Sequence, residues 1–137
     1  MKVFLSYSAG DASLARKIAS GLRREGLAVW LPEEEILPGD NWAERISQAL
    51  NECDAMVALL TQDTPKSGNV QWDIGYALGN KAYRHRVVPV LVGREDQVSL
   101  QVVPWILSER SRVVRLTQPD QPDETVREIA ETLAAAA

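Results

Sequence analysis

The sequence has a single cysteine and a single histidine, and its apolar runs are all shorter than the roughly 20 residues that span a membrane. Cys53 alone cannot form an internal disulfide, which favours a reducing, cytoplasmic setting. With His85 as the only histidine, most metal sites and histidine-dependent catalytic triads are excluded, and its place in the basic stretch 81–86 is typical of a solvated helix end. The chain turns polar at Ser6, so we expect no signal peptide.

Positive charge is also limited. The chain has 15 lysines and arginines against 19 acidic residues, a net charge of -4, and no basic stripe. This balance disfavours nucleic-acid binding by phosphate neutralisation. Its 137 residues, 45% of them hydrophobic, are enough for one core, and we expect residues 1–137 to form a single domain.

Five short stretches are apolar throughout, apart from Arg115 in the last one, which is typical of strands buried on both faces of a parallel sheet. They are residues 3–5, 28–31, 56–60, 87–92 and 113–116. Helical apolar spacing between them predicts a flavodoxin-like, doubly wound α/β fold, with a five-stranded parallel sheet in the order 2-1-3-4-5 and helices on both faces. Pro89 cannot donate a ladder hydrogen bond, so it predicts a bulge or the strand end nearest the sheet edge.

Four helices are predicted from apolar stripes. The stripes are Leu14, Ala15, Ile18, Ala19 and Leu22; Trp42, Ile46, Ala49, Leu50 and Cys53; Val70, Ile74, Ala77 and Leu78; and Val126, Ile129, Ala130 and Leu133. Asp11 is the expected N-cap of the first helix, Gly26 its stop, and Asp40 the N-cap of the second. Trp30 and Trp42 are expected in the core, and a short helical turn is expected at 104–107.

The expected ligand position follows from the predicted topology, because doubly wound folds bind ligands where the strand order reverses. That point lies between the first and third strands, so segments 6–11, 32–40 and 61–69 should converge there. Several functions are excluded, since the sequence lacks the acidic pair of a phosphoacceptor receiver domain, a P-loop, a G-x-G-x-x-G turn and a Ser-His-Asp triad.

Asp73 is the acidic residue in the most informative position. It falls at the rim of the apolar face of the third predicted helix, while Trp72 and Tyr76 point away from that face. A carboxylate there is partly desolvated and suited to chemistry. The alternative is a first-turn aspartate that complements the helix dipole. The acidic run 33–35 offers other carboxylates, although solvated loop charge is the more ordinary interpretation.

These segments resemble bacterial Toll/interleukin-1 receptor (TIR) domains over nearly the whole chain. Residues 4–8 with Asp11 resemble the first box of the family, and residues 26–31, 33–39 and Trp42 resemble its second strand, BB loop and following helix. Residues 53–61, 67–78 and 87–91 are similar to the next strand, the helix that carries the catalytic residue, and the fourth strand. The order of these motifs identifies the chain as a member of the bacterial TIR family.

The resemblance implies that NAD is the substrate and that its nicotinamide–ribose bond is cleaved, giving ADP-ribose or a cyclised form, with no further cofactor and no metal. It also implies association with other TIR domains through the BB loop, residues 32–40, activation by assembly, and a role in antiphage or stress signalling without direct contact to nucleic acid or membrane. A catalytically silent scaffold is the alternative. A third alternative is a nucleoside deoxyribosyltransferase-like enzyme, because such enzymes share the fold plan and the glycosidic chemistry.

By the same resemblance, the catalytic glutamate of the family falls on Asp73, which has the same charge and one methylene less. The aromatic residue often found four positions earlier falls on Asn69. The residues that lie where the first loop of the family contacts the nucleotide are Ser6, Tyr7, Ser8 and Asp11. Turn formation and helix capping are the alternative roles of these four residues.

Overall fold

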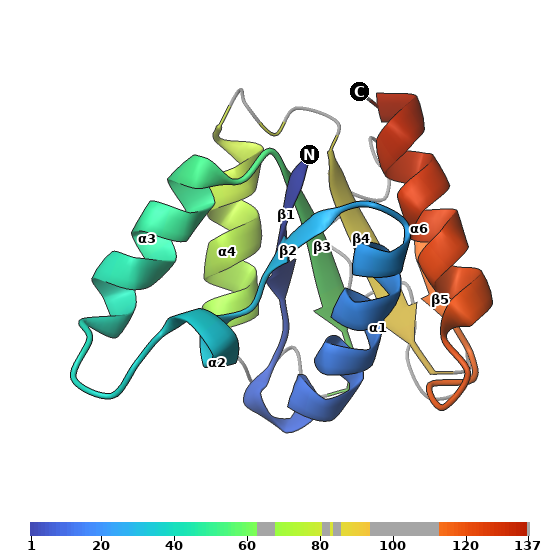
Figure 1. Ribbon diagram of the computed structural model, residues 1–137, viewed down its shortest axis with the longest axis horizontal. Coiled ribbons are helices and arrows are strands. Elements are labelled where there is room, and N and C mark those ends of the chain that lie inside the picture. Colours follow the sequence, from blue (N-terminus) through green and yellow to red (C-terminus); the bar gives the residue numbers. More distant parts are fainter. Residues whose placement is uncertain (63–67, 81–82, 84–85, 94–112, 137) are drawn as a thin grey trace.

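A computed structural model describes residues 1–62, 68–80, 83, 86–93 and 113–136, with the backbone alone for residues 68 and 69. Five parallel strands form one sheet in the order β2-β1-β3-β4-β5, as predicted (Figure 1). The strands are β1 (Lys2–Ser6), β2 (Ala28–Trp30), β3 (Ala55–Leu60), β4 (Val87–Val92) and β5 (Val114–Leu116). Since β1 and β3 are neighbours, the reversal of strand order lies between them, at the point where the sequence predicts a ligand site.

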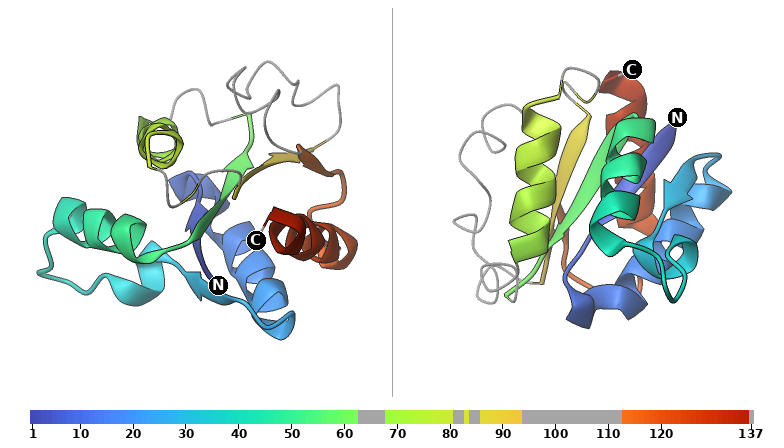
Figure 2. Two further views of the ribbon diagram at one scale, coloured as in Figure 1. Left: turned by 90° about the horizontal axis from the view of Figure 1, so that it is seen from above. Right: turned by 90° about the vertical axis from the view of Figure 1, so that its left-hand side faces the viewer.

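Helices cover both faces of the sheet (Figure 2). On one face lie α1 (Ala12–Arg24) and α6 (Asp123–Ala136), and on the other lie α3 (Trp42–Glu52) and α4 (Gly68–Leu78). Two short helices, η1 (Ala9–Asp11) and α2 (Pro32–Glu35), follow β1 and β2. The sequence did not predict α2, although proline at its first position and three glutamates behind it suit the start of a helix.

Alternation along β1 divides its side chains between two cores. Val3 and Leu5 pack on the side of α1 and α6, whereas Phe4 packs on the side of α3 and α4. Phe4 stacks on Trp30 with 5.2 Å between ring centroids, and Trp30 is 5% exposed, as predicted for a core residue. Ser6, two residues after Phe4, therefore ends β1 on the α4 side of the sheet.

Pro89 does not produce a bulge. It lies opposite Ala58 in an uninterrupted parallel register between β3 and β4. On the other side of β4, β5 pairs only with Val90, Leu91 and Val92. Among the described strands, none faces Pro89 on that side, so its missing amide hydrogen removes no bond to β5.

Of the helix ends predicted at Gly26 and Asp40, one was confirmed and one was wrong. Gly26 has a φ of 90° just after α1, which confirms it as the residue that ends this helix. The N-cap of α3 is Asn41 and not Asp40, because the Asn41 side chain accepts a hydrogen bond from the Glu44 amide at 3.1 Å. Asp40 instead accepts from the Leu37 amide at 2.9 Å and closes the loop before the helix.

Two residues expected in the core lie at the surface. Trp42 is 57% exposed and Leu78 is 40% exposed, so both predictions were wrong. Trp42 is the first residue of α3 and Leu78 the last of α4. Helical spacing shows which face of a helix is apolar, but it does not show where along the helix the covering neighbours stop.

Two other expectations, the solvated histidine His85 and the helical turn at 104–107, lie outside the described residues. None of the helices in the described part of the chain is both long enough and apolar enough to cross a membrane.

Candidate functional site

The centre of the candidate site is a hydrogen bond between Ser6 and Asp73. The Ser6 hydroxyl donates to Oδ2 of Asp73 at 2.9 Å and joins the end of β1 to α4. Both residues are buried, with 1% of Ser6 and 5% of Asp73 exposed. The alternation of β1 explains the contact, because it turns Ser6 toward the helix that carries Asp73.

Burial controls the charge of Asp73. Desolvation raises the pKa of this carboxyl from 3.8 to about 6, and the Ser6 hydrogen bond lowers it by a smaller amount. Asp73 lies in the second turn of α4, which has no acidic residue in its first turn, so the dipole interpretation of Asp73 was wrong. The Asp73 carboxyl therefore titrates closer to neutral pH than an exposed aspartate does.

A half-open hollow of about 230 Å³ gives access to Ser6 and Asp73, and we call it the Asp73 hollow. Phe4 and Ile46 contribute apolar lining, and Trp42 and Trp72 also line it. These two tryptophans are 57% and 54% exposed. A carboxylate and a hydroxyl at the bottom and indole rings around them suit a ligand that carries a flat ring and a polar or cationic centre.

A second hollow of about 360 Å³ adjoins the first, and we call it the Glu33 hollow. It is lined by Tyr7, Ala9, Ala12, Pro32, Glu33 and Trp42. Tyr7, Pro32 and Trp42 line both hollows. The two hollows therefore form one continuous surface across the ends of β1 and β2.

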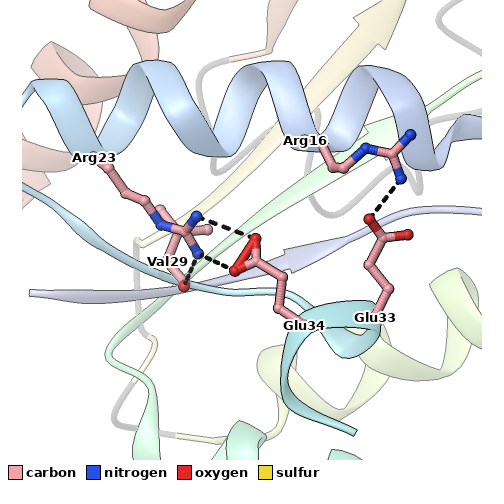
Figure 3. Close-up of polar contacts among 5 residues, drawn as sticks. All are labelled: Arg16, Arg23, Val29, Glu33 and Glu34. Carbon is pink, nitrogen blue, oxygen red and sulfur yellow. Dashed lines mark hydrogen bonds and ion pairs between the residues drawn. The ribbon is translucent and has the colours of Figure 1, made fainter. Parts of the chain in front are cut away.

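Glu33 and Glu34 connect α2 to α1 through two ion pairs (Figure 3). Nη1 of Arg16 lies 2.6 Å from Oε1 of Glu33. Arg23 donates to both carboxylate oxygens of Glu34, at 3.1 and 3.0 Å, and to the Val29 carbonyl at 3.0 Å. These two carboxylates were expected to be solvated loop charge, whereas the structure holds both in defined positions at the surface.

Tyr7 and Ser8 follow β1 in adjacent positions but have different surroundings. Tyr7 is 9% exposed, and burial together with the nearby Glu33 carboxylate raises the pKa of its hydroxyl. The Tyr7 hydroxyl accepts a hydrogen bond from the Glu33 backbone amide, which connects Tyr7 to α2. Ser8 is 4% exposed, and in the described part of the chain its hydroxyl has no hydrogen-bond partner.

Asp11 connects the first loop to the end of β3. It occupies the N-cap position of α1 without a side-chain capping bond, and its Oδ2 accepts from the Thr61 hydroxyl at 3.1 Å. The backbone of Asn69 lies in α4, and its side chain is outside the described residues. Segments 6–11 and 32–40 thus converge with Thr61, although Ser8 and Asp11 line neither hollow in the described residues.

The principal site residue that sequence reasoning missed is Trp42. The apolar stripe of α3 assigned it to the core, whereas the structure places it between the two hollows. Its position directly after the loop and the cap, at the first residue of a helix, was the available signal. Within the described ranges, no group of three or more histidine, cysteine, aspartate or glutamate side chains is placed to hold a metal ion.

Comparison with solved structures finds the same fold in proteins of low sequence identity. The metazoan TIR-STING receptor from C. gigas, solved with 2',3'-cGAMP, has a TM-score of 0.74 and 19% identity over 93% of this chain, which spans 38% of that receptor. The TIR domain of a Toll-related receptor from Hydra magnipapillata has a TM-score of 0.67 and 18% identity, covering 98% of this chain and 94% of that one.

A CMP N-glycosidase from Clostridium botulinum is also similar, with a TM-score of 0.58, 19% identity, and coverage of 94% of this chain and 98% of that chain. None of the curated proteins matches the sequence. A family model described as TIR domain matches residues 3–130. Because this match covers nearly the whole chain, the protein belongs to the TIR domain family.

Proposed function

We propose that this TIR domain binds NAD and cleaves its nicotinamide–ribose bond, with Asp73 as the catalytic carboxylate. The observation that carries the proposal is the position of Asp73, which is buried beside Ser6 at the bottom of a half-open hollow at the strand ends. Its raised pKa, about 6, is typical of carboxylates in functional sites.

The chemistry needs little more than a fixed negative charge. As the bond between C1′ and the pyridinium nitrogen breaks, its electron pair goes to nicotinamide, and positive charge develops on the ribose. An ionised Asp73 stabilises that charge. Nicotinamide leaves as a neutral base without being protonated, so a histidine is not required. Water then adds to C1′ and loses a proton to give ADP-ribose, or adenine adds instead to give a cyclic product.

Two features of the chain adjust this chemistry. The Ser6 hydrogen bond holds the Asp73 carboxylate and favours its ionised form. The aspartate side chain reaches about 1 Å less far than a glutamate would, and a misplacement of this size can cost on the order of 100-fold in rate. We therefore expect slow cleavage by the isolated domain.

The direct test measures nicotinamide release from NAD by concentrated protein. Asp73→Asn keeps the size and removes the charge, so it should abolish release. Asp73→Glu should increase release by about 10- to 100-fold if reach is the main deficit. Asp120→Asn, at an exposed turn before α6, is the matched control and should retain wild-type release. Cleavage that survives in Asp73→Asn would exclude Asp73 as the catalytic group.

A second part of the proposal is assembly through residues 32–40, with a role in antiphage or stress signalling in the bacterial cytoplasm. Its structural support is Leu37, which is 64% exposed in this segment, and Gly39, whose φ of 94° defines the loop. Specific activity should then rise with protein concentration. Gly39→Val should strain the loop and reduce both self-association and activity. Self-association without cleavage, even in Asp73→Glu, would instead support a scaffold function.

The similarity to a CMP N-glycosidase supports one alternative substrate class. Both reactions break a bond between a base nitrogen and C1′ of a ribose. CMP should therefore be assayed beside NAD, with cytosine as the measured product. If cytosine is released from CMP faster than nicotinamide is released from NAD, CMP would replace NAD as the proposed substrate.

A further inference from the structure

The Glu33 hollow has no part in the cleavage chemistry described above. The Asp73 hollow, at about 230 Å³, is smaller than the roughly 300–1,000 Å³ typical of sites for drug-sized ligands. A dinucleotide whose nicotinamide riboside lies beside Asp73 must therefore extend beyond it. The Glu33 hollow adjoins at Tyr7, Pro32 and Trp42 and offers about 360 Å³ in that direction.

Trp42 is placed to contact a base in the second hollow. It begins α3, it is 57% exposed, and it lines both hollows. A tryptophan packed in the core would not be available to a ligand, but this one is open to both hollows. Stacking of bases on exposed aromatic side chains is a general means of binding nucleotides.

Glu33 is a fixed acceptor beside the same space. Oε1 of Glu33 lies 2.6 Å from Nη1 of Arg16, and the Glu33 backbone amide donates a hydrogen bond to the Tyr7 hydroxyl. The residue comes three positions after the end of β2. In dinucleotide-binding α/β folds, an acidic residue that follows the second strand accepts hydrogen bonds from ribose hydroxyls. Ala9 and Ala12, with their small side chains, also line the Glu33 hollow.

From these observations, and resting on the proposed cleavage of NAD, we propose that the Glu33 hollow binds the adenosine half of the dinucleotide. Trp42 stacks on the base, and the Glu33 carboxylate accepts hydrogen bonds from the ribose hydroxyls. A phosphate on the 2′ oxygen would meet this carboxylate, so the site discriminates against 2′-phosphorylated dinucleotides. Glu33 and Trp42 are therefore specificity-determining residues rather than catalytic ones.

The test measures binding, which does not depend on cleavage. Calorimetric titration of the whole chain with ADP-ribose and with 2′-phospho-ADP-ribose should show at least a tenfold preference for ADP-ribose. Glu33→Gln keeps an acceptor but removes the charge, so the preference should fall below about threefold. Glu34→Gln is the matched control. It removes the same charge from the same short helix, and Glu34 lines neither hollow in the described residues, so the preference should stay tenfold.

Trp42 is tested with the same probe. Trp42→Leu should weaken ADP-ribose binding about tenfold or more, and Trp42→Phe, which keeps a stacking ring, should stay within about threefold of wild type. Thermal unfolding establishes that each variant is folded. Equal binding of the two probes by wild type, an unchanged preference in Glu33→Gln, undiminished binding by Trp42→Leu, or no binding of ADP-ribose would each overturn the inference. If discrimination persists but NAD is not cleaved by wild type or Asp73→Glu, the proposed cleavage fails and the binding site stands.

Discussion

The two faces of the sheet are covered by pairs of helices that differ in how completely they close. On the α1 and α6 face, packing is so close that a Cβ added at Gly21 would lie 2.9 Å from Cγ2 of Val126. On the α3 and α4 face, Trp42 and Trp72 are more than half exposed, and the Asp73 hollow opens between the helices. The same sheet thus supports one closed interface and one open one.

This difference separates a face that stabilises the fold from a face that leaves a hollow open to solvent. The closed face buries apolar side chains from β1, β3 and β4 together with α1 and α6, which is the arrangement that stabilises a fold. On the open face, Trp42 and Trp72 line the hollow and are only partly buried. This arrangement keeps Asp73 out of bulk water yet accessible to a ligand. The comparison predicts that equal substitutions on the two faces will have unequal effects.

The largest difference is expected between two isoleucines. Ile18 in α1 is fully buried, whereas Ile46 in α3 lines the Asp73 hollow. Ile18→Ala should reduce the free energy of unfolding by about 3–4 kcal/mol, because it leaves a closed cavity. Ile46→Ala should cost about 1–2 kcal/mol, since it enlarges a space that is already open. Urea unfolding measures both values, and equal losses would contradict the distinction between the faces.

A smaller effect with a characteristic pH dependence is expected at Asp73. Its pKa of about 6 in the folded protein exceeds the ordinary value of 3.8. Between these values the folded state binds more protons than the unfolded state, so the free energy of unfolding falls as pH rises through this window. Asp73→Asn has no such loss. It should be more stable than wild type by about 3 kcal/mol at pH 7.5, and most of this advantage should disappear near pH 4.

Urea unfolding of wild type and Asp73→Asn at pH 4 and pH 7.5 measures this change. A difference in stability that is the same at both pH values would show that burial does not control the charge of Asp73. An advantage of Asp73→Asn over wild type that shrinks as pH rises would reverse the sign of the proposed shift.

The smallest effects are expected at two helical glycines, one on each face. Gly21→Ala forces a contact with Val126, whose branched side chain has little freedom to turn in a helix, and should cost about 1 kcal/mol. At Gly75 in α4, an added Cβ meets nothing within 4 Å. Gly75→Ala should therefore stabilise the protein by about 0.5–1 kcal/mol, because alanine is the better helix former. Thermal unfolding measures both changes. Shifts of the midpoint temperature with the same sign in Gly21→Ala and Gly75→Ala would contradict the comparison of the two faces.

Much of the fold was predictable, whereas the site was predictable only in part. The five strands and their order followed from apolar runs without alternation, which require cover on both faces. The position of Asp73 beside the apolar face was also predicted, because a carboxylate next to an apolar stripe is unusual. The ion pair of Glu33 with Arg16 joins residues on different elements, and no local spacing indicates such a contact.

The limit of the sequence is clearest on α4, whose apolar stripe is centred near Val70, Ile74 and Ala77. At roughly 100° per residue, helical periodicity placed Leu78 within that stripe and Asp73 at its rim, about 40° beyond Ala77. The sequence by itself determined the fold class, the strand order and the rim position of Asp73. The tertiary structure decided that Asp73 is 5% exposed and Leu78 40% exposed, because β1 brings Ser6 against the Asp73 side of the helix and the other side ends at the surface. Burial at a helix rim depends on which neighbour lies beside it, and that neighbour comes from a distant part of the chain.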